Sequence, residues 1–174
     1  MKTVGLDLAR VGDFTVAAVV VDYDVRLIEQ FPHGLKYREI VAQAAQYVDA
    51  ADMTFVDAGG LGDPVCELLR EDFPNKITAI KITGGESAYL TGRDWTVPKA
   101  LLMETLASAF SRGVITVSAP NPGRAILEEE FKHFIYKPGR NPKYEAAAGH
   151  HDDTVLAVAL AVFGRTLHDQ RTER

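Results

Sequence analysis

Aspartate residues stand at the ends of three strongly apolar segments of this chain. Asp7 interrupts an apolar strand, Asp57 ends another, and Asp152 and Asp153 open an almost entirely apolar helix. A carboxylate at the edge of a protein core is costly when it has no partner. The chain is therefore constrained to a fold that brings these carboxylates together around a positive charge. A pair of divalent metal ions is the charge that best suits such a group.

The composition indicates one soluble domain. The 174 residues are 47% hydrophobic and 25% charged, and no apolar run approaches the length of a membrane span or the middle of a signal peptide. We therefore expect a cytoplasmic protein that does not contact membranes. A net charge of −5 and a pI near 5.5 argue against a general nucleic-acid-coating protein. They do not exclude an enzyme that concentrates acids in a metal site. The single cysteine, Cys66, excludes an internal disulfide framework and a cysteine-based zinc cluster.

The order of the elements predicts an α/β fold with a mixed sheet flanked by helices. Three antiparallel strands come first, and strands joined by helical crossovers, hence parallel, follow. The expected strands lie at residues 3–8, 14–21, 25–31, 53–57, 77–82 and 114–117, with a hairpin at 134–136 and 144–146. The expected helices lie at residues 37–50, 63–71, 98–112, 121–132 and 152–167. Residues 84–94 are expected to form a polar loop. No internal repeat or linker divides the chain, so residues 1–174 are expected to form a single domain.

Asp7 is the first candidate site residue. Side chains alternate along a strand, so Asp7 shares a face with Gly5 and Ala9. These small neighbours are expected to leave room for a ligand beside the carboxylate. The alternative is a core aspartate satisfied by a helix terminus or a turn amide.

Asp57 and the acidic pair complete the candidate site. Asp57 ends a buried strand before Gly59 and Gly60, at the edge where open α/β sheets bind ligands. It could instead belong to the cap of the next helix. One of Asp152 and Asp153 is expected to be a helix cap, since aspartate is common there. Asp153 is the preferred metal ligand, with Asp152 as cap or second ligand.

These carboxylates suit the hydrolysis of a phosphodiester. The reaction requires an activated water, a neutralised phosphate and a stabilised leaving oxygen. Two Mg²⁺ or Mn²⁺ ions about 4 Å apart supply all three, and such hard cations prefer carboxylate oxygens. Asp7 would most naturally bridge the two ions.

Three segments in this order resemble the ribonuclease H-like nucleases. Within that group the chain is similar to the nuclease domain of a bacteriophage large terminase, the subunit of the DNA-packaging motor. The segments that carry the resemblance are Val4–Arg10 with Gly12–Val16, Phe55–Pro64, and His151–Thr154.

The resemblance implies a metal-dependent endonuclease that cleaves double-stranded concatemeric viral DNA in the cytoplasm of an infected bacterium. Its metal ligands would be Asp7, Asp57 and one or both of Asp152 and Asp153, and Asp13 could assist or simply be a turn residue. Its partners would be DNA, the packaging ATPase domain of the same full-length protein, and the portal and small terminase. The chain contains no G-x-x-x-x-G-K-[ST] motif for such an ATPase. We therefore expect an excised domain, although a stand-alone nuclease is the alternative.

Other polar residues have weaker signals. His150 and His151 precede the acidic pair and could take part in catalysis or simply form hydrogen bonds in a loop. Basic residues at the tip of the expected hairpin suit phosphate contacts, although surface charge explains them almost as well. They are Lys137, Arg140 and Lys143. Lys99 flanks the glycine-bearing loop, and the run 128–130 of three glutamates is expected to be a solvated helix face.

Three other functions fit parts of the pattern. A Holliday-junction resolvase would use the same carboxylates but works as a dimer. A sugar-kinase-like fold would use Asp7 to hold Mg-ATP, and it requires more of a phosphate-binding glycine turn than Gly12 alone. A non-catalytic module would only bind DNA or the portal protein.

Overall fold

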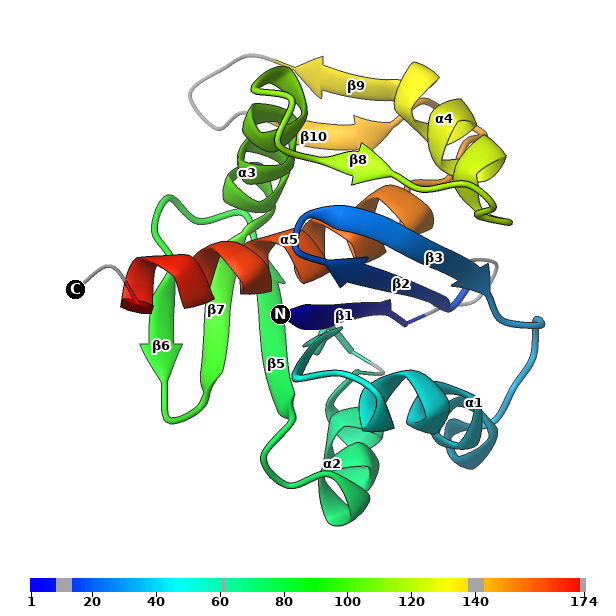
Figure 1. Ribbon diagram of the computed structural model, residues 1–174, viewed down its shortest axis with the longest axis vertical. Coiled ribbons are helices and arrows are strands. Elements are labelled where there is room, and N and C mark those ends of the chain that lie inside the picture. The colour runs from blue at the N-terminus through cyan, green and yellow to red at the C-terminus, as the bar shows by residue number, and fades with distance from the viewer. Residues whose placement is uncertain (9–13, 61, 138–142, 173–174) are drawn as a thin grey trace.

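The computed structural model describes residues 1–8, 14–60, 62–137 and 143–172 (Figure 1). Its strands are β1 (Lys2–Asp7), β2 (Val16–Val21), β3 (Asp24–Gln30), β4 (Met53–Asp57), β5 (Ile77–Thr83), β6 (Tyr89–Thr91), β7 (Asp94–Pro98), β8 (Thr116–Val117), β9 (Phe134–Lys137) and β10 (Lys143–Ala146). Its helices are α1 (Tyr37–Asp49), α2 (Gly62–Asp72), α3 (Lys99–Ser111), α4 (Arg124–Lys132) and α5 (Asp153–Thr172). None of the helices within these ranges is both long and apolar enough to cross a membrane.

One large mixed sheet organises the molecule. Its strands follow the order β6-β7-β5-β4-β1-β2-β3-β8, and β9 pairs with β10 in a separate hairpin. The first three strands are antiparallel, whereas β1, β4, β5 and β7 are parallel neighbours. This arrangement confirms the predicted fold class: three antiparallel strands, then parallel strands, with helices on the sheet.

The helices cover the two faces of the sheet in separate layers. Alternate residues of β1 face opposite sides, so Val4 and Leu6 pack with α1 and α2. Val16 and Phe55 belong to the second apolar cluster, which includes α5 and α3. In Figure 1, α5 runs across the sheet beside β1 and β2, on the side opposite to α1 and α2. The sheet is therefore buried on both faces at its centre.

The segment 84–94 differs from the polar loop expected from the sequence. Residues 84–88 contain no helix or strand, but residues 89–93 form the edge strand β6 and the turn into β7, and β7 pairs with β5. Asp94 fixes this pairing, because its carboxylate accepts the Ala79 backbone N–H at 2.9 Å and forms an ion pair with Arg70. β6 is fully exposed, which explains why its sequence lacks an apolar pattern. Helix α2 also begins at Gly62, one residue before the expected start at residue 63.

Helix α5 lies unusually close to β1 because of a glycine. A Cβ atom on Gly5 would lie 1.9 Å from the carbonyl oxygen of Ala157, so no larger residue fits between strand and helix. Two residues before Gly5 on the same face of β1, the Thr3 hydroxyl donates to the carbonyl oxygen of Ala161 at 3.0 Å. Two strand residues advance about 6.6 Å and four helical residues about 6 Å, so the two elements stay in step.

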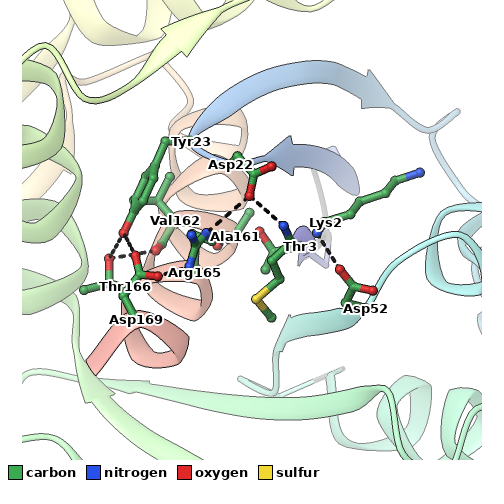
Figure 2. Close-up of polar contacts among 11 residues, drawn as sticks. Lys2, Thr3, Asp22, Tyr23, Asp52, Ala161, Val162, Arg165, Thr166 and Asp169 are labelled. Carbon is green, nitrogen blue, oxygen red and sulfur yellow. Dashed lines mark hydrogen bonds and ion pairs between the residues drawn. The ribbon is translucent and has the colours of Figure 1, made fainter. Parts of the chain in front are cut away.

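The far end of α5 is anchored on the turn between β2 and β3. Figure 2 shows the Tyr23 hydroxyl, which donates to Asp169 at 2.8 Å. Arg165 forms an ion pair with Asp169, and its guanidinium lies over the Tyr23 ring, 5.2 Å from the centroid. Asp22 and Tyr23 both have positive φ, the backbone form typical of tight hairpin turns. These contacts and the packing at Gly5 together fix the direction of α5.

Replacing Gly5 by alanine is expected to destabilise the fold, because the added methyl group meets helix backbone that cannot move aside cheaply. The free energy of unfolding should fall by about 2–3 kcal/mol, as for other overpacked cores. Gly84→Ala is the matched control, since nothing lies within 4 Å of its Cβ position. Urea unfolding of both variants measures the difference, and equal stabilities would contradict the close packing.

Candidate metal centre

Asp7 and Asp57 lie side by side at one edge of the sheet. β1 and β4 are parallel with Leu6 opposite Val56, so their last residues fall at the same level. Both side chains face α5, because Gly5 and Phe55, two residues earlier on each strand, contact that helix. Both residues are buried, at 7% and 8% exposure. The strand ends therefore present two buried carboxylates to the same space.

The packing of α5 brings the third carboxylate to these two. Thr3 lies opposite Ala161 and Gly5 opposite Ala157, and the same step leads to Asp7 and Asp153. Asp153 is the first residue of α5, is 6% exposed, and accepts the Phe14 backbone N–H at 3.0 Å.

Asp152 has a different environment from Asp153. Its backbone carbonyl accepts the Leu156 N–H at 2.8 Å, so it occupies the cap position before α5. Its carboxylate is partly exposed and forms an ion pair with the Lys99 ammonium at 2.6 Å. The structure thus separates the acidic pair into a buried Asp153 and a cap, Asp152, that is joined to α3.

The four aspartates Asp7, Asp57, Asp152 and Asp153, called here the carboxylate cluster, lie close enough for their charges to act on Asp7. The pKa of Asp7 is raised well above its usual value, first by burial and then by the negative charges of Asp57, Asp153 and Asp152. The Lys99 ammonium acts in the opposite direction and lowers the pKa. Because each ionised carboxylate makes ionisation of Asp7 more costly, the cluster favours a bound cation.

The donor chemistry of the cluster fits Mg²⁺ or Mn²⁺, which prefer carboxylate oxygens. Within the described ranges, no three histidine, cysteine, aspartate or glutamate side chains are close enough together to hold one ion. Like charges repel at short range, and backbone N–H groups hold two members of the cluster. Asp57 accepts the Gly59 N–H at 2.9 Å, and Asp153 accepts that of Phe14. A cation between the carboxylates would offset this repulsion.

Several expectations about these residues need revision. The space beside Gly5 is filled by the backbone of α5, not left for a ligand, so the ligand-facing side of Asp7 is toward the strand end. Asp57 does stabilise the turn before α2 through Gly59, as the capping alternative predicted in part. Asp13 and Ala9 lie outside the described residues.

The two histidines before α5 occupy distinct positions. His151 is half exposed, and its Nδ1 lies 3.8 Å from a carboxylate oxygen of Asp153. His150 stacks on His133 with ring centroids 3.7 Å apart. Of the pair, His151 is the one beside the cluster.

The basic hairpin residues are only partly described. Lys137 forms an ion pair with Glu145 on the facing strand of the β9–β10 hairpin, which is present as predicted. Lys143 is exposed and borders a cleft of about 710 Å³ that Lys99 and the segment 83–86 also line. Arg140 lies outside the described residues. Contact of these side chains with DNA stays a prediction.

The sequence does not place two further polar residues, Lys99 and Glu130, near the carboxylate cluster. Lys99 reaches the cluster only through the fold, since it lies 53 residues from Asp152. Glu130 was expected on a solvated face but is buried at 6% exposure, so that prediction is wrong for this residue. A helical signal exists: Glu130 follows the buried Leu127 by three residues, which places both on one face.

Solved structures that share this fold are nuclease domains of phage large terminases. That of thermophilic phage G20c, with bound magnesium, is 20% identical over 94% of this chain and 80% of that chain, with a TM-score of 0.68. That of bacterial virus Sf6 is 18% identical over 92% of this chain and 87% of that chain, also at 0.68. That of Thermus phage P74-26 is 18% identical over 92% of this chain and 77% of that chain, at 0.65.

These likenesses show which fold the chain has. The chain has the ribonuclease H-like fold, and in particular the form found in large terminase nuclease domains, as its sequence predicted. The G20c domain is also known with cobalt, and a mutant form of the Sf6 domain with manganese or calcium. No protein-family model and no curated protein sequence matches the chain.

Glu130 gives the protein a testable pH dependence. Burial raises its pKa from 4.5 to about 7, so the folded state holds this proton more tightly than the unfolded state. The stabilisation is complete below about pH 4.5 and is lost as the pH rises to about 7. In EDTA, the unfolding free energy of the wild type should fall over this range by up to about 3 kcal/mol more than that of Glu130→Gln. Urea titrations at several pH values measure both, and parallel profiles would contradict the assignment.

Proposed function

We propose that this chain is a metal-dependent endodeoxyribonuclease domain that hydrolyses phosphodiester bonds of double-stranded DNA. The observation that carries the proposal is the carboxylate cluster, in which Asp7 and Asp57 end neighbouring strands and Asp152 and Asp153 lie at the start of α5. The fold shared with terminase nuclease domains supports it.

Asp7, Asp57 and Asp153 would hold two Mg²⁺ or Mn²⁺ ions, with Asp152 as a further ligand. When bound, such ions activate a water and neutralise the charge that develops on the phosphate. The protein contributes the placement of its carboxylates: two come from rigid strand ends and one from the first turn of α5. Lys99 keeps Asp152 oriented at the cap and adds positive charge at the mouth of the site.

The cleft beside Lys99 is the proposed path for the DNA backbone. It has a volume of about 710 Å³ and connects Lys99 at the cluster with Lys143 on β10. The glycine-bearing segment 83–86 also lines this cleft. Glu104 and Glu145 line the same cleft, so its charge is mixed.

The likeness to terminase nuclease domains supports a proposal for the cellular role. We propose that the domain cuts concatemeric viral DNA during genome packaging in an infected bacterium. In that role it would act with a packaging ATPase domain of the same full-length protein, the portal and the small terminase.

Replacing Asp7 by alanine is expected to abolish plasmid nicking in Mn²⁺. Activity should fall by at least about 100-fold, because the residue proposed to contact both ions is lost. Asp72→Asn is the matched control, since Asp72 is an exposed aspartate on α2. Cleavage of supercoiled plasmid is followed on gels, with EDTA as the metal-free reference.

The outcomes separate the candidate functions. Full activity of Asp7→Ala would overturn the proposed metal centre. Inactivity of the wild type together with DNA binding in mobility-shift assays would favour a non-catalytic binding module. Cleavage of four-way junctions but not of linear duplexes would favour a resolvase.

A further inference from the structure

Glu130 differs from its neighbours on α4. Glu128 forms an ion pair with Arg124, and Glu129 forms one with Lys132, both at the exposed surface. Glu130 instead turns inward between α4 and α5. A buried carboxylate in this position requires a partner that compensates for lost hydration.

That partner is the first turn of α5. A carboxylate oxygen of Glu130 accepts the Val155 backbone N–H at 2.9 Å in a buried environment. The first N–H groups of a helix have no acceptor within the helix, and the positive end of the helix dipole favours a carboxylate there. Glu130 therefore caps α5 from helix α4. The N–H that it accepts belongs to Val155, two residues after Asp153.

Asp153 is consequently held from two directions. The Phe14 N–H fixes its carboxylate, and Glu130 fixes the backbone of the turn that carries it. Without the bond to Glu130, the packing at Gly5 would still place the middle of α5. Its first turn, and with it Asp153, would lose its lateral support.

This arrangement is costly for stability alone. Glu130 is buried close to Asp153, whose charge disfavours its ionised form. An uncharged acceptor at the same place would cap the helix without repelling the cluster.

We propose that Glu130 is a positioning residue of the metal centre: its hydrogen bond to Val155 sets the first turn of α5 and thereby places Asp153 opposite Asp7 and Asp57. The inference rests on the proposed function, because it assigns Glu130 a role in placing a ligand of the ions. Glu130 itself touches neither DNA nor the reacting atoms in this account.

Three substitutions separate the hydrogen bond from the charge. Glu130→Gln keeps an acceptor oxygen at the same reach without the charge, Glu130→Asp keeps the charge but withdraws the oxygen, and Glu130→Ala removes both. Glu129→Ala is the matched control on the exposed face of α4. Thermal melts in EDTA first show that each variant is folded. Calorimetric titration with Mn²⁺ then gives metal affinity, and plasmid nicking gives kcat and KM separately.

The hydrogen bond should determine the results. Glu130→Ala and Glu130→Asp are expected to bind Mn²⁺ about 10–100-fold more weakly, the usual effect of losing an outer partner of a metal ligand. Their kcat should fall, with KM for DNA nearly unchanged. Glu130→Gln and Glu129→Ala should stay within about 3-fold of the wild type.

The contrary results are equally specific. Wild-type Mn²⁺ affinity in folded Glu130→Asp or Glu130→Ala would overturn the inference. So would a loss of affinity in Glu130→Gln as large as in Glu130→Asp, because the charge would then be the active feature. If Glu130→Ala does not fold, the other two variants decide the matter. Failure of the wild type itself to bind Mn²⁺ or cut DNA would instead refute the proposed function, and the inference with it.

Discussion

The contact between α5 and β1 at Gly5 fixes how closely the helix lies on the sheet. Strand and helix backbones touch there, and the matched advance of the two elements carries this contact from Thr3 and Ala161 toward Asp7 and Asp153. The turn at Tyr23 anchors one end of the helix, and Glu130 and Phe14 hold the other. Because Gly5 has no side chain, α5 can lie close to the strand that ends at Asp7.

The same packing creates an electrostatic conflict. It buries Asp7 among three other carboxylates, so the pKa of Asp7 rises and the ionised cluster opposes folding. Lys99 offsets only part of this repulsion. Sites that work by binding cations commonly carry such a cost, because the ligands must be in place before the ion arrives. In this account, divalent metal is therefore a source of stability as well as of reactivity.

Local chemistry made part of this structure predictable from the sequence. Apolar runs located the central strands, and the aspartates that end them marked the site. The edge strand β6 was missed because an exposed strand has no apolar alternation. Lys99 and Glu130 depend on contacts across long sequence separations, which periodicity does not encode. The small size of Gly5 indicates space for a ligand when only the sequence is known. The fold shows that α5 fills that space. The division between Asp152 and Asp153 likewise depends on where α5 begins.

We propose that the start of α5 and the ends of β1 and β4 form one metal site. Its most direct test is a crystal structure of the protein with Mn²⁺, in which anomalous scattering locates the ions independently of any activity. We expect two ions beside the strand ends, both bound by Asp7. Asp57 and Asp153 should each contribute oxygens. Ions bound without Asp7, or an absence of Mn²⁺ from the carboxylate cluster at millimolar concentration, would contradict it.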